Sequence, residues 1–215
     1  GAFQVLHGSS IHSTFDFSPE RYICKRGVKL IAQPMKGTAC RDNQNEKNDT
    51  RMKESLRNSR KERAENTMIA DLLRNDLTHY ATPGSIKVIE ECEIKTYNTV
   101  HQMVSTIEAK LNKKEDGWIA FLKTLPAGSM TGAPKNEVVR NIEELESFHR
   151  GIYAGHIGYI DPNGDFDFNV VIRTLQLDTD RNLALLHVGS AITLLSNPEH
   201  EYEECLLKAE GILKY

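Results

Sequence analysis

The chain has 215 residues, with 27 basic and 30 acidic side chains, a formal net charge of −3 and four cysteines. This length suffices for one large or two small domains with a sizeable core, and so mild a charge implies no general attraction to nucleic acids or anionic membranes. The cysteines form no CxxC pair, which argues against a zinc site or a disulfide framework and favours a reducing compartment. No apolar run approaches membrane-spanning length and no secretory signal is recognised, so we expect a soluble cytoplasmic protein.

Apolar periodicity and turn residues predict strands that cluster between helices without a regular βαβ repeat. We therefore expect an α+β fold with mainly antiparallel β-sheets flanked by helices. Residues 1–16 show no clear period. In chain order, the expected elements are two strands in 21–33 that turn at Arg26-Gly27, a long helix from about Asp49 to Leu73, strands in 83–97, an amphipathic helix in 98–111 capped by Asn98, a short helix in 117–125, a helix in 136–146, a hairpin of 152–160 with 165–177, an apolar strand in 183–193 and a final helix in 198–213.

The segment Leu125–Lys135, LPAGSMTGAPK, directly precedes the helix in 136–146. Ser129 or Thr131 would cap that helix, and Pro134 would fit its first turn. Alternatively, the two glycines of the segment leave backbone N–H groups open to an anion at the start of the helix. On this segment alone, simple capping is favoured over anion binding.

Three single residues carry candidate chemistry. Lys36, in QPMKGT, follows a predicted strand, where apolar neighbours would lower the pKa of its amine and make it a nucleophile or a base. A solvated loop lysine is the more frequent alternative. Arg173 interrupts the apolar strand VVIRTL, and a half-buried arginine needs an anionic partner, either a protein carboxylate or a ligand. His101 borders an apolar face and, taken alone, is interpreted as a hydrogen-bonded border residue.

Charged residues repeat at helical spacing in several segments. Glutamates three residues apart share a helical face, and two such helices facing each other would supply oxygen ligands suited to Mg²⁺. Spacing alone does not choose among the pairs, which are Glu62 with Glu65, Glu143 with Glu146, and Glu201 with Glu204. A basic stripe of Lys53, Arg57 and Arg60 would suit nucleic acid, but no aromatic residues interleave with it. A solvated helix face is the better interpretation of this stripe.

Nine segments together resemble the family of chorismate-utilising enzymes, and they follow the family's order from about Phe17 to the C-terminus. They are SPERY (18–22), PMKGT (34–38), RAENTMIADLLRNDL (63–77), PGSIKV (83–88), VHQMVS (100–105), GSMTGAPK (128–135), YAGHIGYI (153–160), VVIRTL (170–175) and PEHEYEECLLKA (198–209). Each segment alone is a weak signal, whereas nine in register are specific. The resemblance implies the chorismate-binding fold, with residues 17–215 as the catalytic domain and residues 1–16 as a remnant of an N-terminal segment.

Within the family, the chain most resembles the first component of the aminodeoxychorismate synthase branch. The lysine before Gly-Thr discriminates, because anthranilate synthases typically carry alanine there. Isochorismate and salicylate synthases share the lysine, but ENTMIADLLRNDL and TGAPK are similar to the aminating branch. This resemblance implies that chorismate and ammonia, supplied by a glutamine amidotransferase partner, yield 4-amino-4-deoxychorismate for 4-aminobenzoate and folate synthesis. The alternatives are the first component of anthranilate synthase and a catalytically incomplete chorismate-binding fragment.

The resemblance also implies a role for individual residues. Lys36 would add to C2 of the ring while the C4 hydroxyl leaves, Glu20 would protonate that hydroxyl, and Thr38 and His101 would lie beside the ring. One chorismate carboxylate would be held through Mg²⁺ and the other by protein groups. The implied substrate-binding residues are Ser129, Tyr153, Arg173, Gly189, Ala191 and Lys208. The implied magnesium ligands are Glu62, Glu65, Glu201 and Glu204.

The sequence departs from the family pattern in two places. The family's glycine-rich turn reads GSAIT here, so Ala191 replaces a glycine, which is tolerable if the φ angle of Ala191 is negative. The stretch between FQV and SPER is shorter than in the family, and the N-terminal domain that carries the feedback site of anthranilate synthases is missing. The chain therefore resembles a fragment of a longer family member.

Overall fold

The computed structural model describes residues 5–8, 12–114, 116–194 and 196–213. The chain divides into two compact units, each of which combines separate stretches of sequence. The smaller unit contains residues 1–20, 148–157 and 169–215, and the larger unit contains residues 21–147 and 158–168. Among the described residues, no helix is long and apolar enough to cross a membrane.

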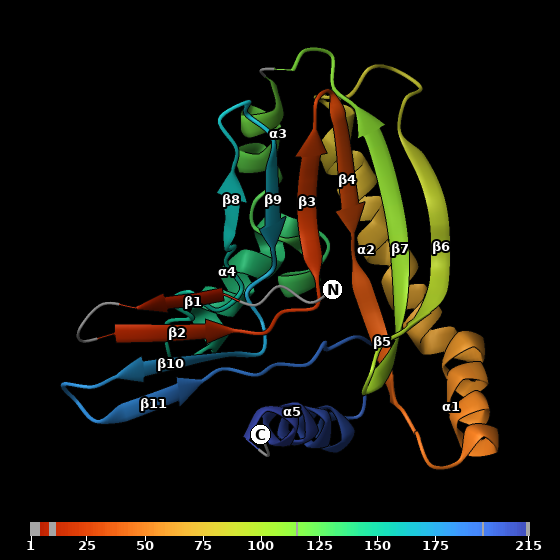
Figure 1. The fold of residues 1–215 in the computed structure, drawn as a ribbon, viewed down its shortest axis with the longest axis vertical. Helices are drawn as coiled ribbons and strands as arrows, with labels where there is room; N and C mark the ends of the chain where they lie inside the picture. Colours follow the sequence, from red (N-terminus) through yellow and green to blue (C-terminus); the bar gives the residue numbers. More distant parts are fainter. Residues whose placement is uncertain (1–4, 9–11, 115, 195, 214–215) are drawn as a thin grey trace. The chain divides into compact units, whose positions relative to one another are not determined.

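The larger unit is built on a seven-stranded sheet in the order β5-β7-β4-β3-β9-β8, in which β6 also pairs with β7 (Figure 1). The strands are β3 (Arg21–Arg26), β4 (Lys29–Gln33), β5 (Met35–Cys40), β6 (Lys87–Thr96), β7 (Val100–Lys110), β8 (Gly158–Ile160) and β9 (Phe166–Asn169). The helices are α1 (Glu46–Asn58), α2 (Arg60–Thr78), α3 (Asp116–Thr124), the short 3₁₀ helix η1 (Gly128–Met130) and α4 (Lys135–Leu145). Helices α1 and α2 pack against β5, β6 and β7, so strand β7 is covered by helices as well as flanked by strands.

The smaller unit contains a four-stranded antiparallel sheet in the order β1-β2-β10-β11. Its elements are β1 (Val5–Gly8), β2 (His12–Asp16), β10 (Thr174–Asp178), β11 (Leu183–Leu186) and helix α5 (Pro198–Leu213). The buried carboxylate of Asp16 accepts hydrogen bonds from the side chains of Asn169 and Thr174. These bonds connect the end of β2 to the last residue of β9 and the first residue of β10. The structure confirms the predicted α+β fold with antiparallel sheets.

The segment 98–111 is wrongly predicted as a helix. It forms β7, which pairs with β4, β5 and β6, and its residues from His101 to Ile107 are buried. Because the strand is buried on both faces, its apolar residues do not alternate with polar ones, and they imitate a helical period. Asn98 therefore precedes a strand and caps no helix.

Three further boundaries differ from expectation. The long helix predicted from Asp49 to Leu73 is two helices, α1 and α2, because Ser59 between them has extended dihedral angles. The predicted strand 165–177 is interrupted between β9 and β10, where Arg173 adopts a φ of 54°. The predicted strand 183–193 ends at Leu186. The predicted hairpin of 152–160 with 165–177 is confirmed only where β8 pairs with β9, because residues 152–157 form no strand. The turn at Arg26-Gly27 and helices α3 and α5 are confirmed.

Candidate active site

The PMKGT segment places Lys36 and Thr38 on β5, separated by Gly37. Gly37 has a φ of +82°, and a Cβ at this position would lie 2.9 Å from Oε2 of Glu62 and 2.9 Å from Cδ1 of Leu56. Only glycine tolerates both this backbone conformation and this close approach. The missing side chain therefore lets helix α2 bring Glu62 against β5, next to the lysine that precedes the glycine.

The amine of Lys36 forms no hydrogen bond or ion pair with the residues that the structure describes. The side chain is half-buried, and no described residue forms a hydrogen bond or ion pair with its amino group. Neighbouring Thr38 is exposed, and its Oγ1 accepts a hydrogen bond of 3.2 Å from Nε2 of Gln102 on β7. Strand β5 thus carries both the Lys36 amine, which has no partner among the described residues, and the Thr38 hydroxyl, which Gln102 holds in place.

Glu65, one turn after Glu62 on α2, has the properties of a residue that binds a cation. Its side chain is buried, and its Oε1 has no hydrogen-bond partner among the described residues. The amino group of Lys61 lies 4.0 Å from this oxygen, beyond hydrogen-bond distance. A buried carboxylate oxygen without a partner is unfavourable unless a donor or a cation completes it, and hard carboxylate oxygens are the ligands that Mg²⁺ prefers.

Helix α5 carries the other two predicted magnesium ligands, in the smaller unit. Glu201 is buried and accepts a hydrogen bond from the hydroxyl of Ser190. Glu204 forms an ion pair of 2.7 Å with Lys208, whose Nζ also donates to the carbonyl oxygen of Gly189 at 2.9 Å. These contacts attach the segment after β11 to α5, so the predicted ligands and the predicted substrate contacts of this unit share one network.

The side chain of Tyr153 leaves no room for a side chain at position 189. A Cβ at residue 189 would lie 2.6 Å from the Tyr153 hydroxyl oxygen, which no side chain permits without rearrangement. The Tyr153 ring stacks on His187, with centroids 5.4 Å apart, and Phe148 stacks on the same histidine at 5.3 Å. Ala191 is not among the described non-glycine residues that have a positive φ angle. Its backbone conformation therefore tolerates alanine, as the sequence analysis expected.

Arg173 lies in the smaller unit with Glu20, the predicted proton donor. Burial lowers the pKa of the Arg173 guanidinium, and the carboxylate of Glu20 partly offsets this effect. Glu20 is itself buried, and its carbonyl oxygen accepts a hydrogen bond from the backbone N–H of Val170. Glu20 therefore supplies a carboxylate of the kind that sequence analysis required for a half-buried arginine at this position.

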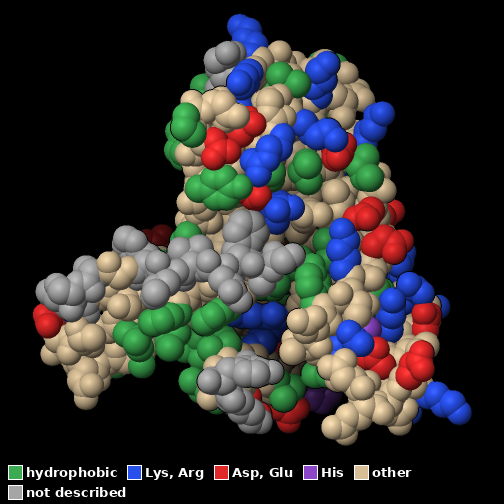
Figure 2. All heavy atoms as spheres, in the orientation of Figure 1, with side chains coloured by type: hydrophobic (Ala, Val, Ile, Leu, Met, Phe, Trp, Pro, Cys, Tyr) green, Lys and Arg blue, Asp and Glu red, His purple; other side chains and the backbone are tan. Residues whose placement is uncertain are grey.

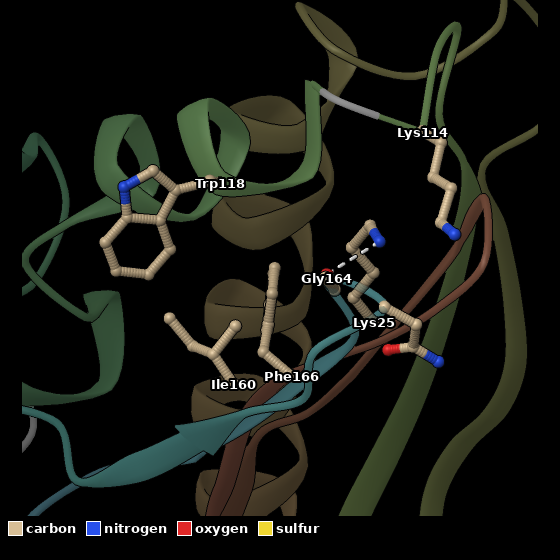
Figure 3. A pocket seen from close by; sticks show the side chains of 7 residues that line it. Lys25, Lys114, Trp118, Ile160, Gly164 and Phe166 are labelled. Carbon is tan, nitrogen blue, oxygen red and sulfur yellow. Dashed lines mark hydrogen bonds between the residues drawn. The ribbon is translucent and has the colours of Figure 1, made fainter.

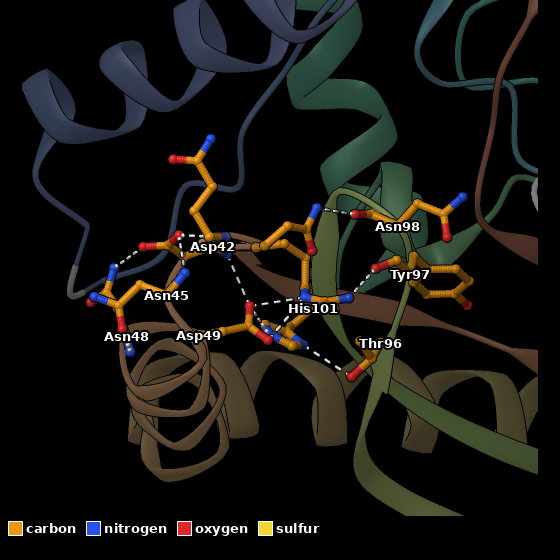
Figure 4. A network of polar contacts seen from close by, with 11 residues as sticks. Asp42, Asn45, Asn48, Asp49, Thr96, Tyr97, Asn98 and His101 are labelled. Carbon is orange, nitrogen blue, oxygen red and sulfur yellow. Dashed lines mark hydrogen bonds and ion pairs between the residues drawn. The ribbon is translucent and has the colours of Figure 1, made fainter.

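His101 is held inside the larger unit by both ring nitrogens (Figure 4). Its Nδ1 lies 3.0 Å from the Thr96 hydroxyl, and its Nε2 lies 3.0 Å from Oδ1 of Asp49 on α1. Arg41 donates to the same carboxylate at 2.8 Å, as does the backbone N–H of Asp42 at 2.9 Å. The Asp42 bond, with help from Arg41 and His101, lowers the pKa of Asp49 to about 2. The histidine is thus hydrogen-bonded as expected, but fully buried instead of at a border.

The capping interpretation of LPAGSMTGAPK is wrong. Helix α4 begins after Pro134 and has no side-chain cap, and the Thr131 hydroxyl donates to the carbonyl of Ala127 instead. Ser129 lies in η1, half-buried, and its side chain forms no hydrogen bond with described residues. Lys135 fixes the start of α4 through Asp76 at 2.6 Å and the Thr124 carbonyl at 2.8 Å. The backbone N–H groups of Met130 and Thr131, which follow Ser129, donate to the carbonyl oxygens of Ala127 and Gly128.

The four predicted magnesium ligands are divided equally, because α2 belongs to the larger unit and α5 to the smaller unit. Within the described residues, no group of three or more His, Cys, Asp or Glu side chains is arranged to hold a metal ion. The same division applies to the organic site. Lys36, Thr38, His101 and Ser129 come from the larger unit, while Glu20, Tyr153, Arg173, Gly189, Ala191 and Lys208 come from the smaller unit.

A separate pocket of about 330 Å³ in the larger unit contains none of the predicted site residues. Trp118, Phe166 and Lys25 help to line it, and the buried Lys25 amine donates to the carbonyl of Gly164 at 2.9 Å (Figure 3). The larger unit also exposes apolar side chains, Ile119 and Ile160 among them. Figure 2 shows hydrophobic side chains at its surface between lysines and arginines.

Comparison with known proteins identifies the family of the chain. The family of chorismate binding enzymes matches residues 4–214. The chain belongs to this family. It is 45% identical to the chloroplastic aminodeoxychorismate synthase of Arabidopsis thaliana over 90% of the chain and 21% of that protein. It is 38% identical to an anthranilate synthase component 1 of Haloarcula marismortui over 91% of the chain and 37% of that protein.

A solved structure shows the same fold. Anthranilate synthase component I from Streptococcus pneumoniae superimposes with a TM-score of 0.85 at 29% identity, covering 98% of the chain and 46% of that protein. The chorismate-binding fold predicted from the motifs is therefore confirmed. The chain spans about a fifth to two fifths of the length of the two curated relatives described above.

Sequence reasoning missed Asp49 and Gln102, the partners of His101 and Thr38. The omission of Gln102 follows from the helix wrongly predicted at 98–111. Had the segment been predicted as a strand, alternation would have placed His101 and Gln102 on opposite faces. The register then makes Gln102 the cross-strand neighbour of Thr38. Asp49 carries no comparable signal, because its contact with His101 joins elements far apart in the sequence.

Proposed function

We propose that the chain is the chorismate-binding part of an aminodeoxychorismate synthase, which converts chorismate and ammonia to 4-amino-4-deoxychorismate. The observation that carries this proposal is the Lys36 amine, half-buried, without a protein partner, and beside the Gly37 that lets Glu62 approach. An amine in this position suits covalent addition at C2 of the ring while the C4 hydroxyl leaves. Ammonia would then add at C4, and the bond between C2 and the Lys36 amine would break, which releases the free amine. The similarity to the Arabidopsis aminodeoxychorismate synthase supports the same choice.

The remaining residues divide the work of binding and proton transfer in this proposal. One chorismate carboxylate is bound by Arg173, Tyr153, Lys208 and the backbone near Gly189 and Ala191. Ser129 and backbone N–H groups beside it bind an anionic group of the same substrate. Glu20 donates a proton to the C4 hydroxyl as it leaves. Thr38 lies beside the ring, and His101 stabilises the strand on which the ring rests.

The carboxylates of the two units fit a magnesium ion. Glu65 contributes an oxygen without a protein partner, and Glu62, Glu201 and Glu204 supply further hard oxygen ligands. When bound, the ion supplies positive charge for a carboxylate of chorismate. Nothing in the chemistry of these four side chains favours a softer metal.

Ammonia is proposed to come from a separate glutamine amidotransferase. Hydrolysis of glutamine by a cysteine needs a reactive thiolate. Burial raises the pKa of the thiols of Cys24 and Cys205, which keeps both neutral. Cys92 is buried. We therefore expect activity with ammonium salts at high pH and no use of glutamine without the partner. We also propose that the protein is located in the cytoplasm.

The test is the product formed from chorismate, Mg²⁺ and ammonium. We expect 4-amino-4-deoxychorismate, with the enolpyruvyl group retained, and a covalent adduct on Lys36 in the mass spectrum of the protein. Lys36→Ala should lose the adduct, and its residual product should shift toward direct attack of ammonia at C2. Anthranilate with released pyruvate, and no adduct, would assign the chain to the anthranilate branch.

The anthranilate alternative has its own support. The Haloarcula relative is named an anthranilate synthase component, and its identity to the chain is 38%, compared with 45% for the plant enzyme. Lysine at position 36 argues against this alternative, because the resemblance places alanine there in that branch. A chain that binds chorismate and releases neither product would be the incomplete fragment instead.

A further inference from the structure

Gln102 faces the same side of the sheet as Thr38. The two residues are direct cross-strand partners on β7 and β5, and Nε2 of Gln102 donates to the Thr38 hydroxyl at 3.2 Å. The preceding residue, His101, faces the opposite side and is held there by Asp49 and Thr96. The buried histidine contacts thus fix β7 so that Gln102 faces the side of β5 that carries the Thr38 hydroxyl.

The other polar atom of the Gln102 side chain has no partner. Gln102 is only 3% exposed, and its Oε1 is buried without a hydrogen bond to any described residue. A buried carbonyl oxygen without a hydrogen bond is unfavourable. The unpaired Oε1 of Gln102 is explained if a ligand donates a hydrogen bond to it. Because the amide nitrogen is already bound to Thr38, the oxygen is held in a fixed direction.

The proposed reaction offers few donors for this oxygen. The carboxylates and the ether oxygen of chorismate only accept hydrogen bonds, and the one donor on the molecule is the C4 hydroxyl. Ammonia, by contrast, carries three N–H bonds. Glu20 of the smaller unit is already proposed to act on the C4 hydroxyl, whereas Gln102 neighbours Thr38, two residues beyond the Lys36 that attacks C2.

We propose that Gln102 binds the ammonia molecule used as nitrogen donor, with Oε1 accepting one of its N–H bonds. This inference rests on the proposed amination of chorismate. Ammonia held by one N–H bond keeps its lone pair free, directed away from Oε1. Gln102 thereby orients the nucleophile, while Thr38 holds the amide of Gln102 in place.

The test compares Gln102→Met, which keeps the side chain's length but removes the acceptor, with Gln102→Glu, which keeps an acceptor oxygen. At saturating chorismate, we expect Gln102→Met to raise KM for free ammonia by about tenfold, the loss of one hydrogen bond. The KM for chorismate should stay unchanged. Gln102→Glu should stay within about threefold of the wild type for ammonia. Thr106→Val, on the same face of β7, is the control and should change neither constant.

The outcomes separate this inference from the proposed function. If the wild type forms no aminated product from chorismate, the proposed function fails and the ammonia site with it. If the wild type aminates chorismate but Gln102→Met leaves KM for ammonia unchanged, the inference alone is overturned. A raised KM for chorismate alone would assign Gln102 to the C4 hydroxyl and also overturn it.

A second measurement does not depend on the folding of the Met variant. In wild type labelled with ¹⁵N-glutamine, added ammonium should shift the side-chain amide resonance of Gln102, identified by its absence in Gln102→Glu. Sodium at the same ionic strength should leave this resonance in place. An amide resonance that responds equally to sodium and ammonium would contradict binding of ammonia at Oε1.

Discussion

The hydroxyl of Tyr153 lies where a side chain at position 189 would begin, and the backbone of Gly189 is the acceptor for Lys208. We expect Gly189→Ala to push the Tyr153 ring off His187 and to lower the free energy of unfolding by about 1–3 kcal/mol, the usual effect of overpacking. Thermal unfolding followed by circular dichroism measures this, at roughly 2–4 °C per kcal/mol.

A second substitution tests the cause of that loss. Without the hydroxyl, the nearest Tyr153 atom to the new Cβ would be Cζ at 3.8 Å, an ordinary contact. Tyr153→Phe should therefore restore most of the stability lost in Gly189→Ala. If Gly189→Ala costs the same stability in the wild type and in the Tyr153→Phe variant, backbone conformation, and not the clash, requires glycine there.

His156 should make stability depend on pH. Burial lowers its pKa to about 4, although its Nδ1–H donates to the carbonyl of Asn169 at 2.7 Å. Between this value and the unfolded value of about 6.5, the unfolded chain binds more protons, so the free energy of unfolding falls as pH decreases. Above about pH 6.5 the histidine is neutral in both states and the stabilisation is complete.

We expect this loss to be on the order of 2–3 kcal/mol for His156 between pH 7 and pH 4. Urea denaturation of the wild type and of His156→Gln at several pH values measures it. The variant should lose that part of the pH dependence, whereas replacement of the exposed His149 by Gln should leave it intact. A His156→Gln variant with an unchanged pH profile contradicts the assignment.

At the scale of elements, Ser59 separates two helices that the sequence analysis joined. Its hydroxyl accepts a hydrogen bond of 3.3 Å from the backbone N–H of Glu62, and so it caps α2. Ser59→Ala should lower the free energy of unfolding by about 1 kcal/mol, measured by urea denaturation. Ser55→Ala, at an exposed position inside α1, is the matched control and should cost nothing, because alanine is the better helix former. Equal effects of the two substitutions would exclude capping by Ser59.

The break at Ser59 is predictable from the sequence, because a serine with a glutamate three residues later, here Glu62, is a capping-box pattern. Continuous helical periodicity on both sides concealed it. The strand β7 was harder to predict, since Val100, Met103, Val104 and Ile107 fit a helical face. Only pairing with strands distant in the sequence decides between the two structures, and periodicity carries no information on such pairing.

At the scale of the whole molecule, motif order predicted the family and the fold better than local pattern predicted the elements. VHQMVS was recognised as a family segment even though its secondary structure was wrongly predicted. Recognition requires only residue identities in register, whereas secondary structure depends on packing. The unpaired oxygens of Glu65 and Gln102 and the contact of His101 with Asp49 could not be predicted, because hydrogen-bond satisfaction is a property of the folded chain.

The last prediction concerns the magnesium ion, whose proposed ligands come from both units. A ligand that binds only the folded chain stabilises it by RT ln(1 + [L]/Kd), about 2.7 kcal/mol at a hundredfold excess over Kd. Mg²⁺ and chorismate together should therefore raise the unfolding temperature more than the sum of their separate effects, since the carboxylate of one completes the oxygen shell of the other.

Glu65→Gln and Glu204→Gln should each abolish most of this cooperative stabilisation, although the two residues lie on different helices of different units. If both bind one ion, the double variant should lose little more than either single variant, because the second substitution acts on a site that no longer forms. Glu143→Gln, exposed on α4 with the same three-residue spacing to Glu146, is the control and should keep the full effect. Unchanged Mg²⁺ dependence in Glu204→Gln would remove α5 from the metal site, and strictly additive losses would indicate two separate ions.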